Sequence, residues 1–125
     1  MDSRLLAFGI VAGILSGVNL FLHKVAANRL EETSLGEVLR PQFLMQLLRN
    51  PYVYVVLMMG LLVLALDLAF LSNRLPGIVG LNFIIVLGNV LFAFLSVVVL
   101  GEKVDLRIGA GISFGILALI LLSKA

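Results

Sequence analysis

The sequence predicts an all-α membrane protein: four transmembrane helices, with a short amphipathic interfacial helix between the first and the second. Hydrophobic residues make up 62% of the 125 positions and charged residues 13%, whereas soluble domains average about 45–50% and about 25%. The apolar residues gather in four runs, each near or above the roughly 17 to 20 residues that cross about 30 Å of hydrocarbon. These runs cover residues 5–22, 52–71, 77–100 and 106–122, and they predict a single transmembrane domain over residues 1–125.

The first run is predicted to be a helix that stays in the protein. Arg4 precedes it, as a basic residue precedes the apolar part of a signal peptide. Asn19, His23 and Lys24 stand where a signal peptide needs small residues for cleavage, which argues against removal.

The first helix has two unusual faces. Gly9, Gly13 and Gly17 recur every fourth residue, a pattern that allows another helix to approach closely. A neighbouring face becomes more polar toward the linker, and we expect it to avoid lipid. The Ser16 hydroxyl and the Asn19 amide either hydrogen-bond to other helices or line a cavity. His23 either lies at the membrane interface or takes part in binding substrate or transferring protons. This face consists of Ala12, Ser16, Asn19 and His23.

The linker over residues 23–50 is predicted to contain a short helix and then an interfacial helix. Ser34 and Glu37 form a capping-box pattern, in which each side chain binds a free amide at a helix start. After Pro41 one face is apolar and the opposite face polar, which is typical of a helix at the headgroup boundary. Pro51 then suits the first turn of the second crossing helix. The apolar face comprises Phe43, Leu44, Leu47 and Leu48, and the polar face comprises Gln42, Gln46 and Arg49.

The second run contains an acid, Asp67, which lies roughly 6 Å inside the helix end at about 1.5 Å per residue. An ionised carboxylate in hydrocarbon is unfavourable by up to about 2.5–3.5 kcal/mol, so we expect it to face protein or water. Three roles stay open: a structural ion pair, an acid that contacts substrate or coupled protons, and a lipid-facing residue that extends to the interface. The candidate cationic partners are Arg74, Lys24 and Arg107.

Polar or small residues also mark the last two runs. Asn82, Asn89 and Ser96 are seven residues apart, which places them near one helix face at three depths. They either line a path or form a seam of hydrogen bonds to another helix. The final run instead carries small residues that favour close packing and self-association. These are Gly109, Gly111, Ser113 and Gly115.

The basic residues predict a topology. Arg4, Arg74 and Lys124 fall on one side of the four runs, and twice as many basic residues fall on the other. By the positive-inside rule, the two odd-numbered loops lie in the cytoplasm and both termini lie outside. The larger set is Lys24, Arg29, Arg40, Arg49, Lys103 and Arg107.

The composition argues against several classes of function. The chain has no cysteine and one histidine, which excludes thiolate and multi-histidine metal sites. Its net charge of +2 is spread over the loops, so we expect no nucleic-acid partner. We therefore predict a protein without cofactor, metal site or catalytic residues, and not an enzyme.

Several segments carry a resemblance to a known family. Residues 100–106 read LGEKVDL before a glycine-rich final helix, and Pro76 stands 25 residues before Gly101. Residues 19–24 read NLFLHK and residues 47–52 read LLRNPY. In order and spacing these resemble the drug/metabolite transporter superfamily. Its four-helix members include the small multidrug resistance exporters and the flippase subunits for undecaprenyl-phosphate-linked aminoarabinose.

The sequence is more similar to the flippase subunits, because the drug exporters use a glutamate in helix one, where this chain offers only Ser16 and Asn19. The resemblance implies a half-size transporter of the prokaryotic inner (plasma) membrane. It would move a polyisoprenyl-phosphate-linked sugar or similar glycolipid between leaflets, as a homodimer or with a paralogous subunit. On this resemblance Lys24 and Arg74 meet phosphate, and the headgroup meets Asn19, Asn82 and Asn89.

Two other functions stay open. The chain is also compatible with a proton-coupled exporter of a small metabolite or drug that uses Asp67. A third possibility, of another class, is a membrane anchor or regulator of a partner enzyme that transports nothing.

Overall fold

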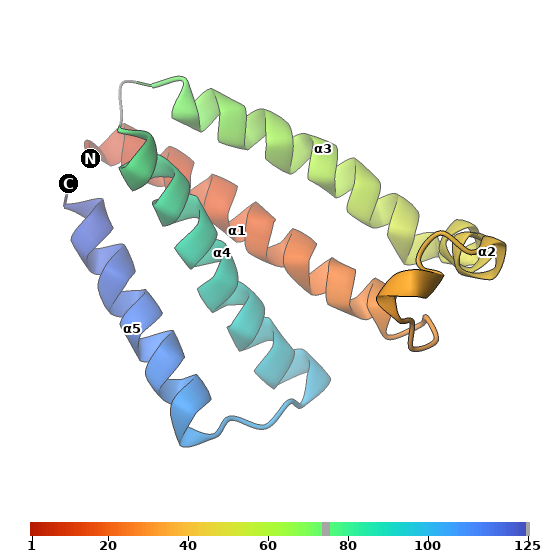
Figure 1. Cartoon of the computed structure of the whole chain (residues 1–125). Helices are drawn as coiled ribbons and strands as arrows, with labels where there is room; N and C mark the ends of the chain where they lie inside the picture. Colours follow the sequence, from red (N-terminus) through yellow and green to blue (C-terminus); the bar gives the residue numbers. More distant parts are fainter. Residues whose placement is uncertain (74–75, 125) are drawn as a thin grey trace.

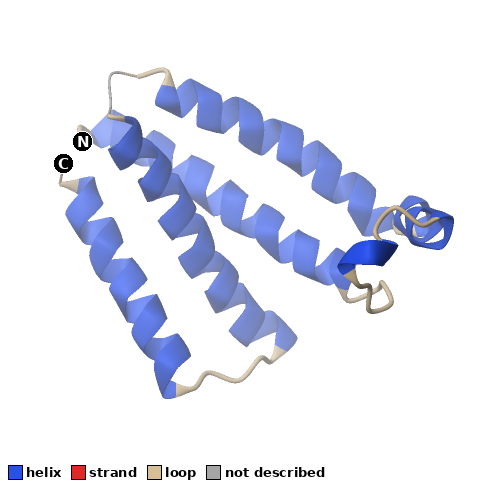
Figure 2. Ribbon diagram, in the orientation of Figure 1, coloured by secondary structure: helices blue, strands red, loops and turns tan. Residues whose placement is uncertain are grey.

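The computed structural model describes residues 1–73 and 76–124, and it confirms the predicted fold class. Among these residues, four helices are long and apolar enough to cross a membrane, and the chain is a multi-pass membrane protein. A short helix and a single 3₁₀ turn lie between the first two crossing helices (Figures 1 and 2). The elements are α1 (Ser3–Ala27), η1 (Leu35–Glu37), α2 (Pro41–Arg49), α3 (Pro51–Leu71), α4 (Gly77–Leu100) and α5 (Leu106–Ser123).

Short polar side chains explain where three of the crossing helices begin. Asp2 Oδ1 accepts a hydrogen bond from the Leu5 amide at 2.8 Å, and Asp105 Oδ1 accepts one from the Ile108 amide at 2.8 Å. Asn50 does the same for α3. Each side chain satisfies an amide that has no partner inside its helix. The first helix therefore extends beyond the predicted 5–22 at both ends, because the cap precedes the apolar run and the helix continues into the linker.

Helix α4 ends where glycine is needed. Gly101 has a φ of 68°, and the Glu102 amide donates to the Ser96 carbonyl oxygen at 3.3 Å. A glycine with a left-handed backbone conformation commonly terminates an α-helix. The short loop that follows makes α4 and α5 antiparallel neighbours (Figure 1).

Helix α1 lies at the centre of the bundle. It packs against α4, which runs parallel to it, and against the antiparallel α3, while α5 packs on α4 (Figure 1). The buried core joins Ala12, Phe70 and Ile84, one from each of α1, α3 and α4. Phe8 stacks on Phe70 with 5.8 Å between ring centroids. These contacts make α1, α3 and α4 one packed unit.

The glycines of α1 face its neighbours, as their spacing predicts. A methyl group on Gly9 would lie 2.9 Å from the Phe70 ring, and one on Gly13 would lie 2.4 Å from Leu87. At Gly17 the obstacle is backbone, because the methyl group would lie 2.8 Å from the Gly88 carbonyl oxygen. At this point, therefore, the backbones of α1 and α4 approach each other closely.

The predicted capping box does not form. Ser34 makes no side-chain hydrogen bond to a helix amide, and the Glu37 amide instead donates to the Ser34 carbonyl oxygen at 3.0 Å. The segment therefore closes a single 3₁₀ turn, which is too short to leave the row of free amides that a capping box serves. The predicted interfacial helix is present as α2, and its apolar residues Leu44 and Leu48 are exposed.

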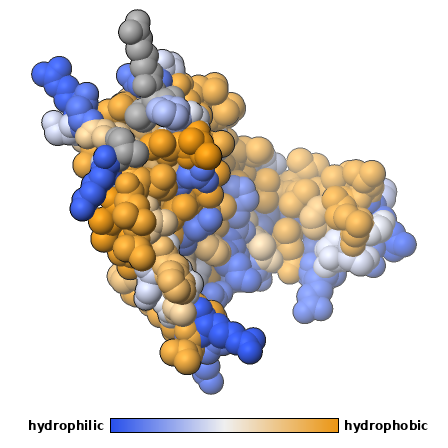
Figure 3. All heavy atoms as spheres, turned by 60° about the vertical axis from the view of Figure 1, so that its left-hand side comes forward, coloured by the Kyte–Doolittle hydropathy of each residue, from blue (hydrophilic) through white to orange (hydrophobic). Residues whose placement is uncertain are grey.

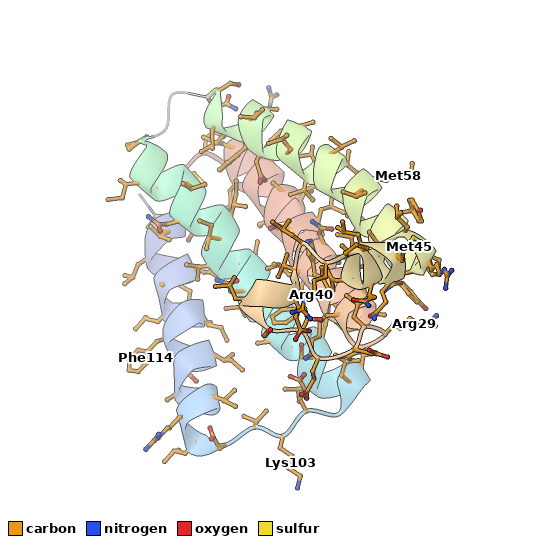
Figure 4. The ribbon with its side chains drawn as sticks, turned by 45° about the vertical axis from the view of Figure 1, so that its right-hand side comes forward. Arg29, Arg40, Met45, Met58, Lys103 and Phe114 are labelled. Atoms are coloured by element: carbon orange, nitrogen blue, oxygen red, sulfur yellow. The ribbon has the colours of Figure 1, made fainter. Side chains whose placement is uncertain are left out.

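The surface agrees with a lipid environment. Apolar side chains cover most of the surface in Figure 3, and hydrophilic side chains project at the ends of the bundle and also lie in its central part. No residue of α5 is fully buried, and Phe114 points away from α4 (Figure 4). Apolar helices exposed in this way need hydrocarbon around them.

The contact at Gly17 predicts an asymmetry between two glycines. Gly17→Ala is expected to lower the free energy of unfolding by about 1–3 kcal/mol, because backbone cannot move aside as a flexible side chain can. Gly60→Ala is the matched control, since its methyl group would lie 3.8 Å from Asn19, an ordinary contact. Thermal unfolding in detergent measures both variants. Equal stability of the two would contradict the close α1–α4 contact.

Candidate functional site

The polar residues inside the membrane divide into groups with different surroundings. Asn19 lies opposite Gly60 on the contact between α1 and α3. Asp67 lies between Val63 and Phe70, both buried, and Phe70 contacts Gly9 of α1. Because residues three and four apart share a helix face, Asp67 is on the side of α3 that meets α1.

Two acceptor oxygens on this contact have no donor. Asn19 Oδ1 and Asp67 Oδ1 are both buried, and neither accepts a hydrogen bond from any described residue. A buried acceptor without a partner costs free energy, about 1–3 kcal/mol for a neutral group and more for a charged one. Such oxygens can accept a hydrogen bond from water, a proton, or a donor group of a solute.

The ion pair considered for Asp67 is not found with either cation that the structure describes. Neither Lys24 nor Arg107 forms an ion pair with its carboxylate, and the third candidate, Arg74, lies outside the described residues. Lys24 instead occupies the last turn of α1, where a cation interacts favourably with the helix dipole. Asp67 is therefore an acid without a described counter-charge.

The rest of the polar face of α1 changes character along the helix. Ala12 is completely buried, and Ser16 is half-buried beside Gly88 of α4. His23 is exposed, and its Nδ1 lies 2.6 Å from the Asn19 carbonyl oxygen of its own helix. The face thus leads from the core to the membrane boundary.

The three polar residues of α4 do not share one environment. Asn82 is exposed, and its Nδ2 donates to the Ile78 carbonyl oxygen one turn earlier. Asn89 is also exposed, whereas Ser96 is only 2% exposed and its Oγ has no described partner. A seven-residue spacing drifts by only about 20° per step on a straight helix, so the three residues stay near one face and differ in which neighbouring element covers them at each depth.

Asn89 opens onto a groove between α4 and α5 of about 380 Å³. Gly111 and Gly115 line the opposite wall, and a methyl group on Gly115 would lie 2.8 Å from Val90. Gly115 therefore serves the contact with α4, while Gly111 has open space beside it. Gly109 lies near Val104, and the exposed Ser113 donates to the Gly109 carbonyl oxygen at 2.9 Å.

Asn50 joins the end of α1 to the start of α3, and the sequence alone did not predict this role. It is 5% exposed, its Nδ2 donates to the Ala26 carbonyl oxygen at 2.9 Å, and its Oδ1 accepts from the Tyr52 amide at 3.1 Å. One carboxamide thus caps α3 and ties it to the end of α1. Its position directly before Pro51 was the available signal, because asparagine is a favoured cap before a helix-starting proline.

Comparisons of the chain with protein-family models, with curated proteins and with solved structures found no match. Among the described residues there is also no cluster of three histidine, cysteine or acidic side chains that is able to hold a metal ion. The candidate site therefore rests on its own geometry: buried oxygen acceptors between α1 and α3, and an exposed amide in the groove between α4 and α5.

Asp67 Oδ1 is buried and has no described donor, which predicts that this side chain lowers the stability of the folded protein. Asp67→Leu is expected to raise the free energy of unfolding by about 1–3 kcal/mol, because it removes a buried oxygen that has no donor. Asp67→Asn keeps a polar group and is expected to give a smaller change. Chemical unfolding in detergent measures both. A loss of stability in Asp67→Leu would show instead that the carboxylate has a structural partner.

Proposed function

We propose that this chain is one half of a membrane transporter. The observation that supports the proposal is the pair of buried acceptor oxygens, Asn19 Oδ1 and Asp67 Oδ1, inside a membrane bundle. Polar groups are expensive in hydrocarbon, and where they occur they generally mark the path of a substrate or ion. A purely structural bundle gains nothing from acceptors without donors.

A second copy, or a paralogous chain, completes the path. Asn89 presents an amide on the surface of a membrane helix without a described hydrogen bond, beside a groove in which Gly111 leaves open space. In hydrocarbon such an amide is stabilised when another polar group covers it. Gly111 of α5 leaves room for the close approach that this requires.

The substrate that we favour is a polyisoprenyl-phosphate-linked sugar or similar glycolipid, moved between leaflets. This choice rests on the resemblance of the sequence to the flippase subunits. Lys24, at the membrane end of α1, is proposed to meet the phosphate on one side of the membrane, and Arg74 is proposed to meet it on the other side. Asn19, Asn82 and Asn89 are proposed to hydrogen-bond to the polar headgroup.

Asp67 favours a second candidate, a proton-coupled exporter of a small metabolite or drug. A carboxylate without a counter-charge is able to bind a proton on one side of the membrane and release it on the other. In this mechanism substrate and proton compete for Asp67, whereas in the flippase the acid only lines the path.

Transport by the purified chain in proteoliposomes distinguishes the two. For the flippase we expect movement of a short-chain polyprenyl-phosphate sugar between leaflets without a pH gradient, and a decrease of at least about tenfold in Lys24→Gln, since a charge-assisted bond contributes about 1.5–3 kcal/mol. For the exporter we expect uptake that requires the gradient and is abolished in Asp67→Asn. Arg4→Gln, at the other end of α1, is the control for both.

If the chain moves neither class of substrate and instead co-purifies with one larger enzyme, the transporter proposal is wrong. The chain would then be an anchor or regulator of that enzyme.

A further inference from the structure

A second polar site lies at the opposite end of the bundle from Asp67, where α1, α2 and α3 meet. It is a pocket of about 360 Å³ whose lining includes Arg29, Arg49, Gln46 and Glu31. Asn50, which ties α1 to α3, forms part of its wall together with Pro51. Figure 4 shows Arg29 at this junction, near α2. We propose that this pocket binds the phosphate of an anionic membrane lipid.

The charge of the pocket favours an anion. Two arginines line it against one acid, and no ion pair joins Glu31 to either arginine among the described residues. Two like charges in one pocket repel each other, and a phosphate between them removes that repulsion. Arginine suits this role, because its planar set of N–H donors matches phosphate oxygens.

Arg29 is already oriented. Its Cζ lies 4.5 Å from the centroid of the Tyr52 ring, a cation–π contact that holds the guanidinium at this junction. The Arg29 N–H groups make no hydrogen bond to any described residue, so they are free to bind an anion. Gln46 uses its Oε1 to accept from the Glu31 amide at 3.3 Å, and its Nε2 remains a further donor without a described acceptor.

The position of the pocket identifies a lipid as the source of the phosphate. The pocket lies at the first turn of α3, where Tyr52 and Tyr54 mark the membrane boundary. On α2, Met45 lies one turn before Arg49 on the same helix face and is 46% exposed. A lipid whose phosphate occupies the pocket places an acyl chain against Met45, whereas soluble phosphate leaves this side chain uncovered. The site is independent of the proposed transport, because it contains none of the proposed path residues.

Lipid binding to the full-length chain in detergent, followed by native mass spectrometry, tests the proposal. The probes are dioleoyl phosphatidylglycerol, dioleoyl phosphatidylcholine and inorganic phosphate. We expect phosphatidylglycerol to bind most tightly, and Arg29→Gln and Arg49→Gln each to weaken it about tenfold, as for loss of one charge-assisted bond. Arg107→Gln removes an arginine that does not line this pocket and is expected to leave binding unchanged.

Glu31→Gln and Tyr52→Phe are expected to give results that misfolding cannot imitate. Glu31→Gln removes the one acid of the pocket and is expected to tighten phosphatidylglycerol binding several-fold. Tyr52→Phe keeps the ring beneath Arg29 and is expected to bind as the unmodified chain does, whereas Tyr52→Leu is expected to bind more weakly.

Three results would overturn the proposal. Equal losses in Arg29→Gln and Arg107→Gln would mean that lipid responds to general surface charge. Equal affinity for phosphatidylcholine and phosphatidylglycerol would mean that the pocket does not select an anion. Inorganic phosphate that binds as tightly as the lipid would mean that the ligand is soluble. Because the readout is binding, a failure of transport leaves this test intact.

Discussion

The arrangement of the bundle depends on the close contact between the backbones of α1 and α4. A methyl group on Gly17 would lie 2.8 Å from the Gly88 carbonyl oxygen. Toward the other end of α1, Gly13 lies against Leu87 of α4, and Gly9 lies against Phe70 of α3 and Phe83 of α4. Hydrophobic burial contributes little between helices in lipid, so packing of this kind supplies most of the attraction. Helix α3 packs on this pair through Phe70, and both Asn19 and Asp67 lie on the contact between α1 and α3.

The crossing helices were predictable because their signals are long and local. Each apolar run has the length of a membrane crossing, and the glycine repeat of α1 correctly predicts a close helix contact. The capping pattern at Ser34 was misleading, because a four-residue motif does not show whether a full helix follows. Likewise the seven-residue spacing of Asn82, Asn89 and Ser96 fixes their angles on α4 but not which neighbour covers each angle.

The candidate site was predictable by residue type and less so by position. That Asp67 and Asn19 avoid lipid follows from the cost of a polar group in hydrocarbon, and both do lie toward neighbouring helices. Which partners they have depends on side chains from elements far apart in the sequence, and the structure gives neither oxygen a described donor. The pocket that we propose to bind lipid had no sequence signal of its own, because Arg29 and Arg49 line one pocket only after the linker folds back.

The one-sided attachment of α5 bears on how the protein is made. The residues of the buried core, Ala12, Phe70 and Ile84, all precede α5 in the chain. The contacts among α1, α3 and α4 therefore do not require α5, and chains begin to fold from the N-terminal end during synthesis. We infer that α5 joins a three-helix unit that is already packed, and that its other side stays available to another membrane helix.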